Sequence, residues 1–91
     1  MPASSELATV VARLPENVAL HARPAGAFVR EAARAAAEIC VEANGRSANA
    51  KSILDILGLG ATGGTELLIS ASGPDAAEAL ERLAELVSSL T

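Results

Sequence analysis

Apolar positions alternate along the chain between a period of two residues and the period of a helix. Residues 7–14 are rich in β-branched side chains and end at Pro15, so they are predicted to form a strand. From Pro24 to about Ala37, apolar residues recur at helical spacing with charged residues on the other side. This pattern predicts an amphipathic helix.

A β-hairpin is predicted next. Residues 38–43 alternate between apolar and polar side chains, and Asn44-Gly45 follows at once. Asn-Gly between alternating segments is the strongest short-range hairpin signal, so residues 46–49 should return as a second strand. The side chains expected to face the core are Ile39, Val41 and Ala43.

Three more elements complete the pattern. Residues 52–57 are predicted to form a short helix with Ser52 as its N-cap, and residues 65–72 alternate as a strand, with Leu67, Ile69 and Ala71 on one face. Residues 76–90 carry a long apolar stripe of helical period. The order βαββαβα contains a strand–helix–strand unit with a gap for a later strand. It predicts one four-stranded sheet with helices stacked on one face.

Length and composition limit the core. The 91 residues, 1–91, are expected to form a single domain. Hydrophobic residues make up 51% of the chain, but alanine dominates them and Phe28 is the only aromatic residue. The core should therefore be small, aliphatic and packed with alanine. It leaves no room for a large enclosed cofactor, and none is expected.

Several classes of protein are disfavoured. One cysteine, Cys40, allows no disulfide framework and no cysteine-based zinc site, and it is interpreted as an inert small hydrophobe. No stretch approaches the ~20 apolar residues of a membrane span, and Met1-Pro2-Ala3-Ser4-Ser5 lacks the features of a signal peptide. A net charge of −4 argues against nucleic acid as a partner. We therefore expect a cytoplasmic domain with no metal site and no membrane insertion.

The charge is uneven along the chain. Residues 1–51 carry a sum of +1, whereas residues 52–91 carry −5. An anion or an acidic partner is expected to bind the first half.

The glycine-rich segment Gly58-Leu59-Gly60-Ala61-Thr62-Gly63 matches the dinucleotide pattern G-x-G-x-x-G. That motif must leave a strand and open a helix, whose N-terminus holds the pyrophosphate. Here a helix-like segment precedes the glycines and a strand follows them. The segment is therefore interpreted as a connection between a helix and a strand.

His21-Ala22-Arg23-Pro24 is the strongest candidate for chemistry. Pro24 belongs in the first turn of a helix, so His21 and Arg23 are expected at its N-terminal end. Unpaired N–H groups and the positive end of the helix dipole favour an anion there, and Arg23 can hold a phosphate with two hydrogen bonds. A neutral imidazole nitrogen can attack phosphorus near neutral pH. An inert surface histidine in a small regulatory interaction domain is the alternative from spacing alone.

Three blocks of residues strengthen the first interpretation. Leu20-His21-Ala22-Arg23-Pro24-Ala25 resembles the active-site signature of HPr, the histidine-containing phosphocarrier family of the bacterial phosphoenolpyruvate-dependent sugar phosphotransferase system. The middle and final segments are similar to that family as well. They are Asn44-Gly45-Arg46, Ala50-Lys51-Ser52-Ile53-Leu54, Leu57-Gly58-Leu59-Gly60 and Ser70 to Leu80.

The resemblance implies an α+β open-faced β-sandwich, βαββαβα, with four antiparallel strands and three helices on one face. It implies a monomeric phosphoryl carrier rather than a turnover enzyme. His21 would accept phosphate on Nδ1 from phosphorylated enzyme I and pass it to IIA domains of sugar permeases, and Arg23 would bind the phosphoryl group. Ser52 would be the target of an HPr kinase/phosphorylase where the organism has one. The residues that match the family's partner-docking face are Arg30, Lys51, Ile53, Leu54 and Leu57.

Two points stay open within the resemblance. Ala19 stands where the family usually has glycine, so the turn ahead of His21 can differ. A paralogue dedicated to nitrogen regulation or to dihydroxyacetone phosphorylation would carry the same signature.

Overall fold

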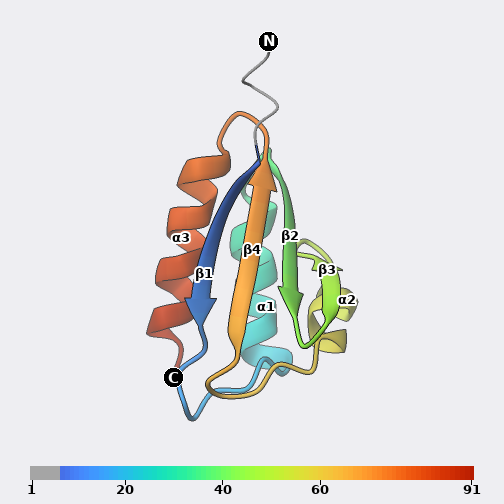
Figure 1. The fold of residues 1–91 in the computed structure, drawn as a ribbon, viewed down its shortest axis with the longest axis vertical. Helices are drawn as coiled ribbons and strands as arrows, with labels where there is room; N and C mark the ends of the chain where they lie inside the picture. Colours follow the sequence, from blue (N-terminus) through green and yellow to red (C-terminus); the bar gives the residue numbers. More distant parts are fainter. Residues whose placement is uncertain (1–6) are drawn as a thin grey trace.

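The last strand in the sequence lies inside the sheet rather than at its edge (Figure 1). The computed structural model describes residues 7–91, and Met1 to Ser5, where no signal peptide is predicted, lie outside the described residues. The elements are β1 (Ala8–Arg13), α1 (Ala22–Ala33), β2 (Glu38–Ala43), β3 (Arg46–Asn49), α2 (Ile53–Gly58), β4 (Glu66–Ser72) and α3 (Ala76–Ser89). The predicted order βαββαβα is confirmed.

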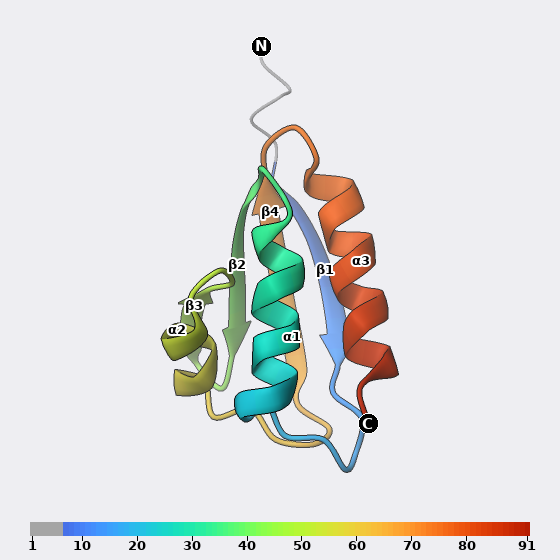
Figure 2. The same cartoon turned by 180° about the vertical axis from the view of Figure 1, so that it is seen from behind.

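The sheet has the strand order β1-β4-β2-β3, and every pair is antiparallel. β4 therefore fills the gap between β1 and β2 that the split strand–helix–strand unit leaves. Helices α1 and α3 cover one face of the sheet, and the short helix α2 lies on the same side, in front of β3 in the view of Figure 2. Within residues 7–91 the opposite face carries no helix, which makes the fold the open-faced β-sandwich that the resemblance implied.

The core lies between the sheet and the two long helices. The side chains predicted to face inward on β2 and β4 are all buried there, and Phe28 of α1 is fully buried among them. Alanines make up about half of the buried apolar positions. Small side chains let the helices approach the sheet closely, so a core with one aromatic ring still packs densely.

The hairpin turn has the geometry that its sequence predicts. Asn44 and Gly45 both adopt positive φ, at 55° and 74°. This combination matches the right-handed twist of the two flanking strands, and asparagine and glycine tolerate it best.

Helix α1 begins at Ala22, two residues before the predicted start at Pro24. Proline fits there because the N–H groups of the first helical turn have no partner inside the helix, so the N–H that proline lacks is not missed. His21 consequently becomes the N-cap residue of α1.

The predicted end of the same helix, at about Ala37, is wrong, because α1 ends at Ala33. Groups distant in sequence bind the backbone beyond that point. The Lys51 ammonium donates to the Ala35 carbonyl at 2.7 Å. The Asp75 carboxylate accepts from the N–H groups of Ala36 and Ala37 at 3.0 and 2.9 Å. These bonds replace the helical ones, so the chain can turn into β2.

Asp75 is the N-cap residue of α3. It precedes α3 as a helix start favours, but its side chain makes no capping bond to α3 and binds the turn after α1 instead. The hydrogen bond from the Ala36 N–H holds the pKa of this carboxyl below its ordinary value of 3.8, helped by the Ala37 N–H and opposed by partial burial. The folded state therefore favours ionised Asp75.

We expect Asp75→Asn to lower the stability of the protein at neutral pH and to leave it nearly unchanged in strong acid. A pKa lowered in the folded state contributes stability above the unfolded value, and that stability is lost as the pH falls through the folded pKa. Urea unfolding of the parent and the variant from pH 7 to pH 2 measures this. A stability difference that stays constant across that range would contradict the role of the charge.

Candidate functional site

His21 stands at the N-terminus of α1 with a fixed backbone and a free side chain. Its N–H donates to the Ala19 carbonyl, and its own carbonyl accepts from the Ala25 N–H, each at 2.9 Å. The imidazole is exposed and makes no capping hydrogen bond. The imidazole is therefore accessible to a partner, which an acceptor of a transferred group needs.

The first turn of α1 offers backbone donors beside this histidine. Within residues 7–91, the N–H groups of Ala22 and Arg23 have no hydrogen-bond acceptor, and both residues are exposed. They carry the positive end of the helix dipole, which favours an anion. A phosphoryl group on His21 would therefore lie next to groups that stabilise its charge.

Two loops support the turn that presents His21. The Leu20 N–H donates to the Ala61 carbonyl at 2.9 Å, which joins the chain before His21 to the glycine-rich loop. Gly63 lies so close to Glu16 that an added Cβ would fall 1.9 Å from the Glu16 carbonyl oxygen. The glycine-rich loop connects α2 to β4, as interpreted from the sequence. It contacts the segment of chain that leads to His21.

Arg23 is exposed, and its Nη2 donates to the backbone oxygen of Thr91 at 3.1 Å. The guanidinium is thus held at the surface close to the start of α1, and this hydrogen bond uses only one of its N–H groups. Sequence reasoning missed Thr91, because the two residues are far apart along the chain and no local pattern joins them.

Helix α2 presents the predicted apolar residues to solvent. Leu54 is the most exposed, at 77%, and Ile53 and Leu57 are exposed at 38% and 37%. The fourth large side chain of this helix, Ile56, is fully buried and anchors the helix. Because α2 packs against α1, the apolar surface and the start of α1 belong to the same side of the molecule (Figure 2).

Ser52 is the N-cap of α2, as predicted. Its hydroxyl accepts from the Asp55 N–H at 3.3 Å, and the Asp55 carboxylate accepts from the Asn49 N–H at 3.2 Å. The side chain of Ser52 is partly exposed at the edge of the apolar surface.

The two predicted basic residues of this surface differ in their environments. Arg30 is exposed, and its Nη1 lies only 3.5 Å from where a Cβ on Gly26 would be, so the guanidinium extends back along α1 toward its start. Lys51 is partly buried and its ammonium is bound to the Ala35 carbonyl. Arg30 therefore supplies accessible charge, whereas Lys51 mainly closes the end of α1.

Other chemistry finds little support in the described part of the chain. Residues 7–91 bring together no group of three or more histidine, cysteine or acidic side chains that could hold a metal ion. Among the helices described, none is long and apolar enough to cross a membrane.

An open-faced α+β domain with an accessible histidine at a helix N-terminus has the features of a small phosphocarrier. Comparison with known proteins agrees. A family model described as the PTS HPr component phosphorylation site matches residues 9–89. The chain belongs to the HPr family, the phosphocarrier proteins of the phosphotransferase system.

Individual relatives share most of the chain. The phosphocarrier protein HPr of Vibrio cholerae is 49% identical over 71 residues, which cover 78% of this chain and 84% of the relative. The HPr-like protein Crh of Bacillus subtilis is 46% identical over 68 residues, covering 75% and 80%. The crystal structure of HPr from Bacillus anthracis superimposes with a TM-score of 0.84 at 41% identity, covering 89% of this chain and 96% of that one.

Proposed function

We propose that His21 accepts a phosphoryl group from phosphorylated enzyme I and passes it to the IIA domain of a sugar permease. The observation that carries this proposal is the exposed, unengaged imidazole at the N-cap of α1 beside two free backbone N–H groups. The lone pair of neutral Nδ1 attacks phosphorus, and the bond to the donor nitrogen of enzyme I breaks as the new N–P bond forms. The second transfer repeats this step with His21 as the donor, so the protein is a carrier and not an enzyme.

Arg23 and the start of α1 act on the phosphoryl oxygens. Phosphoryl transfer is catalysed mainly by positioning and charge stabilisation. The Arg23 guanidinium would exchange its single hydrogen bond to the Thr91 oxygen for two parallel hydrogen bonds to phosphoryl oxygens, because its planar pair of donors matches a phosphate. The N–H groups of Ala22 and Arg23 add two further donors at the same place.

The apolar surface of α2 is proposed as the docking face for both partners. Ile53, Leu54 and Leu57 form a small exposed centre, and Arg23 and Arg30 lie on the same side of the fold. A small face with basic residues suits acidic partners that must bind and leave in turn. We propose that the protein is a monomer, because the residues of the site and of the docking face all come from one chain. Crh of Bacillus subtilis, in contrast, is described as a swapped, intertwined dimer. We also propose that the protein acts in the cytoplasm.

The test is to incubate the full chain with phosphoenolpyruvate and enzyme I and to detect phosphorylation by mass spectrometry. We expect one adduct, located on His21 by fragmentation and lost in mild acid, because a phosphoramidate hydrolyses at low pH and phosphoserine does not. Transfer is then measured to IIA domains of the sugar, nitrogen and dihydroxyacetone branches side by side. An adduct on another residue, or no adduct, would contradict the proposal, and preferred transfer to a domain outside the sugar branch would assign the chain to a paralogue.

Ser52 is proposed as a regulatory phosphorylation site for an HPr kinase/phosphorylase. We expect Ser52→Asp to raise the KM for enzyme I by about tenfold, because an anion beside the docking face repels an acidic partner. Ser52→Asn is the matched control, since asparagine also caps a helix but carries no charge. Steady-state kinetics with enzyme I separates them, and equal KM values for the two variants would argue against a charge effect.

A further inference from the structure

The open face of the sheet carries exposed apolar side chains that lie apart from the proposed phosphotransfer site. Six large apolar side chains of the described residues are exposed, and three of them belong to α2. The other three, Leu7, Val11 and Leu68, are exposed at 64%, 58% and 37%. They lie on the face opposite the helices, because they alternate with the buried positions of β1 and β4. Val11 and Leu68 are direct cross-strand partners, so their side chains are neighbours. Leu7, Val11 and Leu68 are called the open-face patch below.

Two acidic side chains of β2 flank this patch on one side. Glu42 is the cross-strand partner of Leu68, and Glu38 lies on the same face four residues earlier in β2. Neither carboxylate takes part in an ion pair within residues 7–91. On the other side of the patch, Nη1 of Arg13 lies 3.9 Å from Oε2 of Glu66, so the charges of these two side chains neutralise each other. The open face therefore combines exposed apolar side chains with two acidic ones on β2, the reverse of the charge beside α2.

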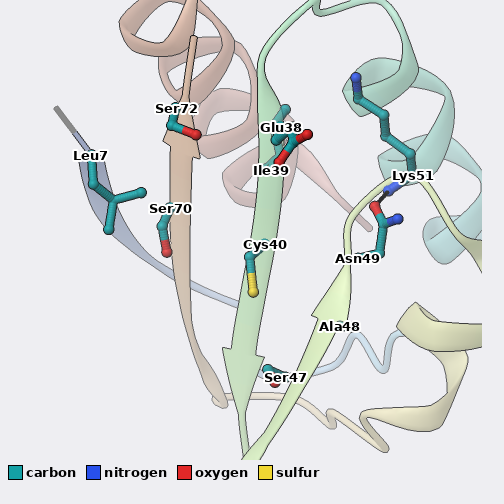
Figure 3. Close-up of a pocket in the computed structure, with 10 residues that line it drawn as sticks. All are labelled: Leu7, Glu38, Ile39, Cys40, Ser47, Ala48, Asn49, Lys51, Ser70 and Ser72. Carbon is teal, nitrogen blue, oxygen red and sulfur yellow. Dashed lines mark hydrogen bonds between the residues drawn. The ribbon is translucent and has the colours of Figure 1, made fainter. Parts of the chain in front are cut away.

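A shallow hollow lies on the same face and includes one of the acidic side chains (Figure 3). The side chains of Glu38, Cys40 and Ser70 line it, where β3 runs beside β2. Lys51 also borders the hollow, but its ammonium is engaged by the Ala35 carbonyl. The hollow thus offers a carboxylate, a thiol and a hydroxyl to an incoming basic side chain.

We propose that the open face binds a protein surface that presents arginine or lysine around an apolar centre. Charge complementarity selects this occupant: the open face of a second copy would bring its own Glu38 and Glu42 against the same acidic residues, whereas a basic surface neutralises them. Apolar contact with the open-face patch adds affinity that does not depend on charge. Because the helices cover the other side of the sheet, such a partner can bind while the start of α1 stays accessible.

The test is an NMR titration of the full chain, labelled with ¹⁵N, with a short blocked peptide that alternates arginine and leucine. We expect saturable shifts of amide signals in β1, β2 and β4 on and around the open-face patch, weakened by added salt because the charges are exposed. A peptide that alternates glutamate and leucine should cause no comparable shifts. Shifts concentrated on α3 or on α2, no saturable shifts, or equal binding of the acidic peptide would overturn the proposal.

Matched variants test the residues themselves. The double variant Glu38→Gln, Glu42→Gln should bind the basic peptide about fivefold more weakly. The control Glu81→Gln, Glu85→Gln removes the same charge from the exposed side of α3 and should bind as the parent does. Val11→Thr with Leu68→Thr should also weaken binding, and threonine suits an exposed strand, so this variant should keep the fold. Parent-like affinity in both open-face variants, or an equal loss in the α3 control, would refute the assignment.

Discussion

Replacing His21 by alanine is expected to abolish phosphoryl transfer from enzyme I. The described chain has no other histidine, and the imidazole nitrogen is the only proposed acceptor at the start of α1. The side chain is exposed and makes no capping hydrogen bond, so its removal should leave stability almost unchanged. Mass measurement after incubation with phosphoenolpyruvate and enzyme I should show a complete loss of the acid-labile adduct.

His21→Gln provides a closely matched second variant. Glutamine keeps a polar side chain of similar reach at the N-cap but offers no nucleophilic ring nitrogen. Both variants should unfold at nearly the parent's temperature and should still compete with the parent for enzyme I, because the docking face on α2 is intact. An adduct that survives in either variant would place the acceptor elsewhere and refute the proposed role of His21.

Replacing Arg23 by alanine is expected to slow phosphoryl transfer by about 100-fold. Removing one preorganised donor to a developing oxyanion costs on the order of 10²–10³ in kcat. The loss should appear mainly in kcat, since the guanidinium acts on the charge of the transferring group, while contact with the partner rests chiefly on α2. Rapid-quench measurements of transfer from phosphorylated enzyme I, over a range of carrier concentrations, separate the two constants.

Arg23→Lys distinguishes charge from geometry. Lysine keeps the positive charge but lacks the planar pair of donors that matches two phosphoryl oxygens. We expect it to recover part of the lost rate and to leave KM near the parent value. If Arg23→Ala raised KM as much as it lowered kcat, Arg23 would act as a docking residue rather than on the phosphoryl group.

Most of the secondary structure could be predicted from the sequence because its signals are local. The alternation of residues 38–43 and the pair Asn44-Gly45 gave β2, the turn and β3 with the observed bounds. Periodicity also identified the inward faces of β2 and β4, since the pleat alone decides which side chains share a face. The end of α1 was missed for the opposite reason. Nothing near Ala33 stops a helix, and the groups that bind the next residues come from Lys51 and Asp75.

The same distinction applies to the candidate site. Proline in a first helical turn located the helix start within two residues, and that was enough to put His21 and Arg23 at its N-terminal end. The hydrogen bond from Arg23 to Thr91 and the close approach of Gly63 to Glu16 join segments distant in sequence. No spacing rule contains such contacts.

The sequence by itself determined the order of the elements, the hairpin turn and the identity of the residues at the start of α1, because each depends on neighbours within a few positions. The tertiary structure alone decided which cations are accessible, engaging Lys51 at the end of α1 while leaving Arg30 at the surface. It also decided which apolar side chains stay exposed after packing and therefore separated a basic side at α2 from an acidic open face. Both outcomes depend on the sheet order, in which β4 enters between β1 and β2 and brings distant segments into contact.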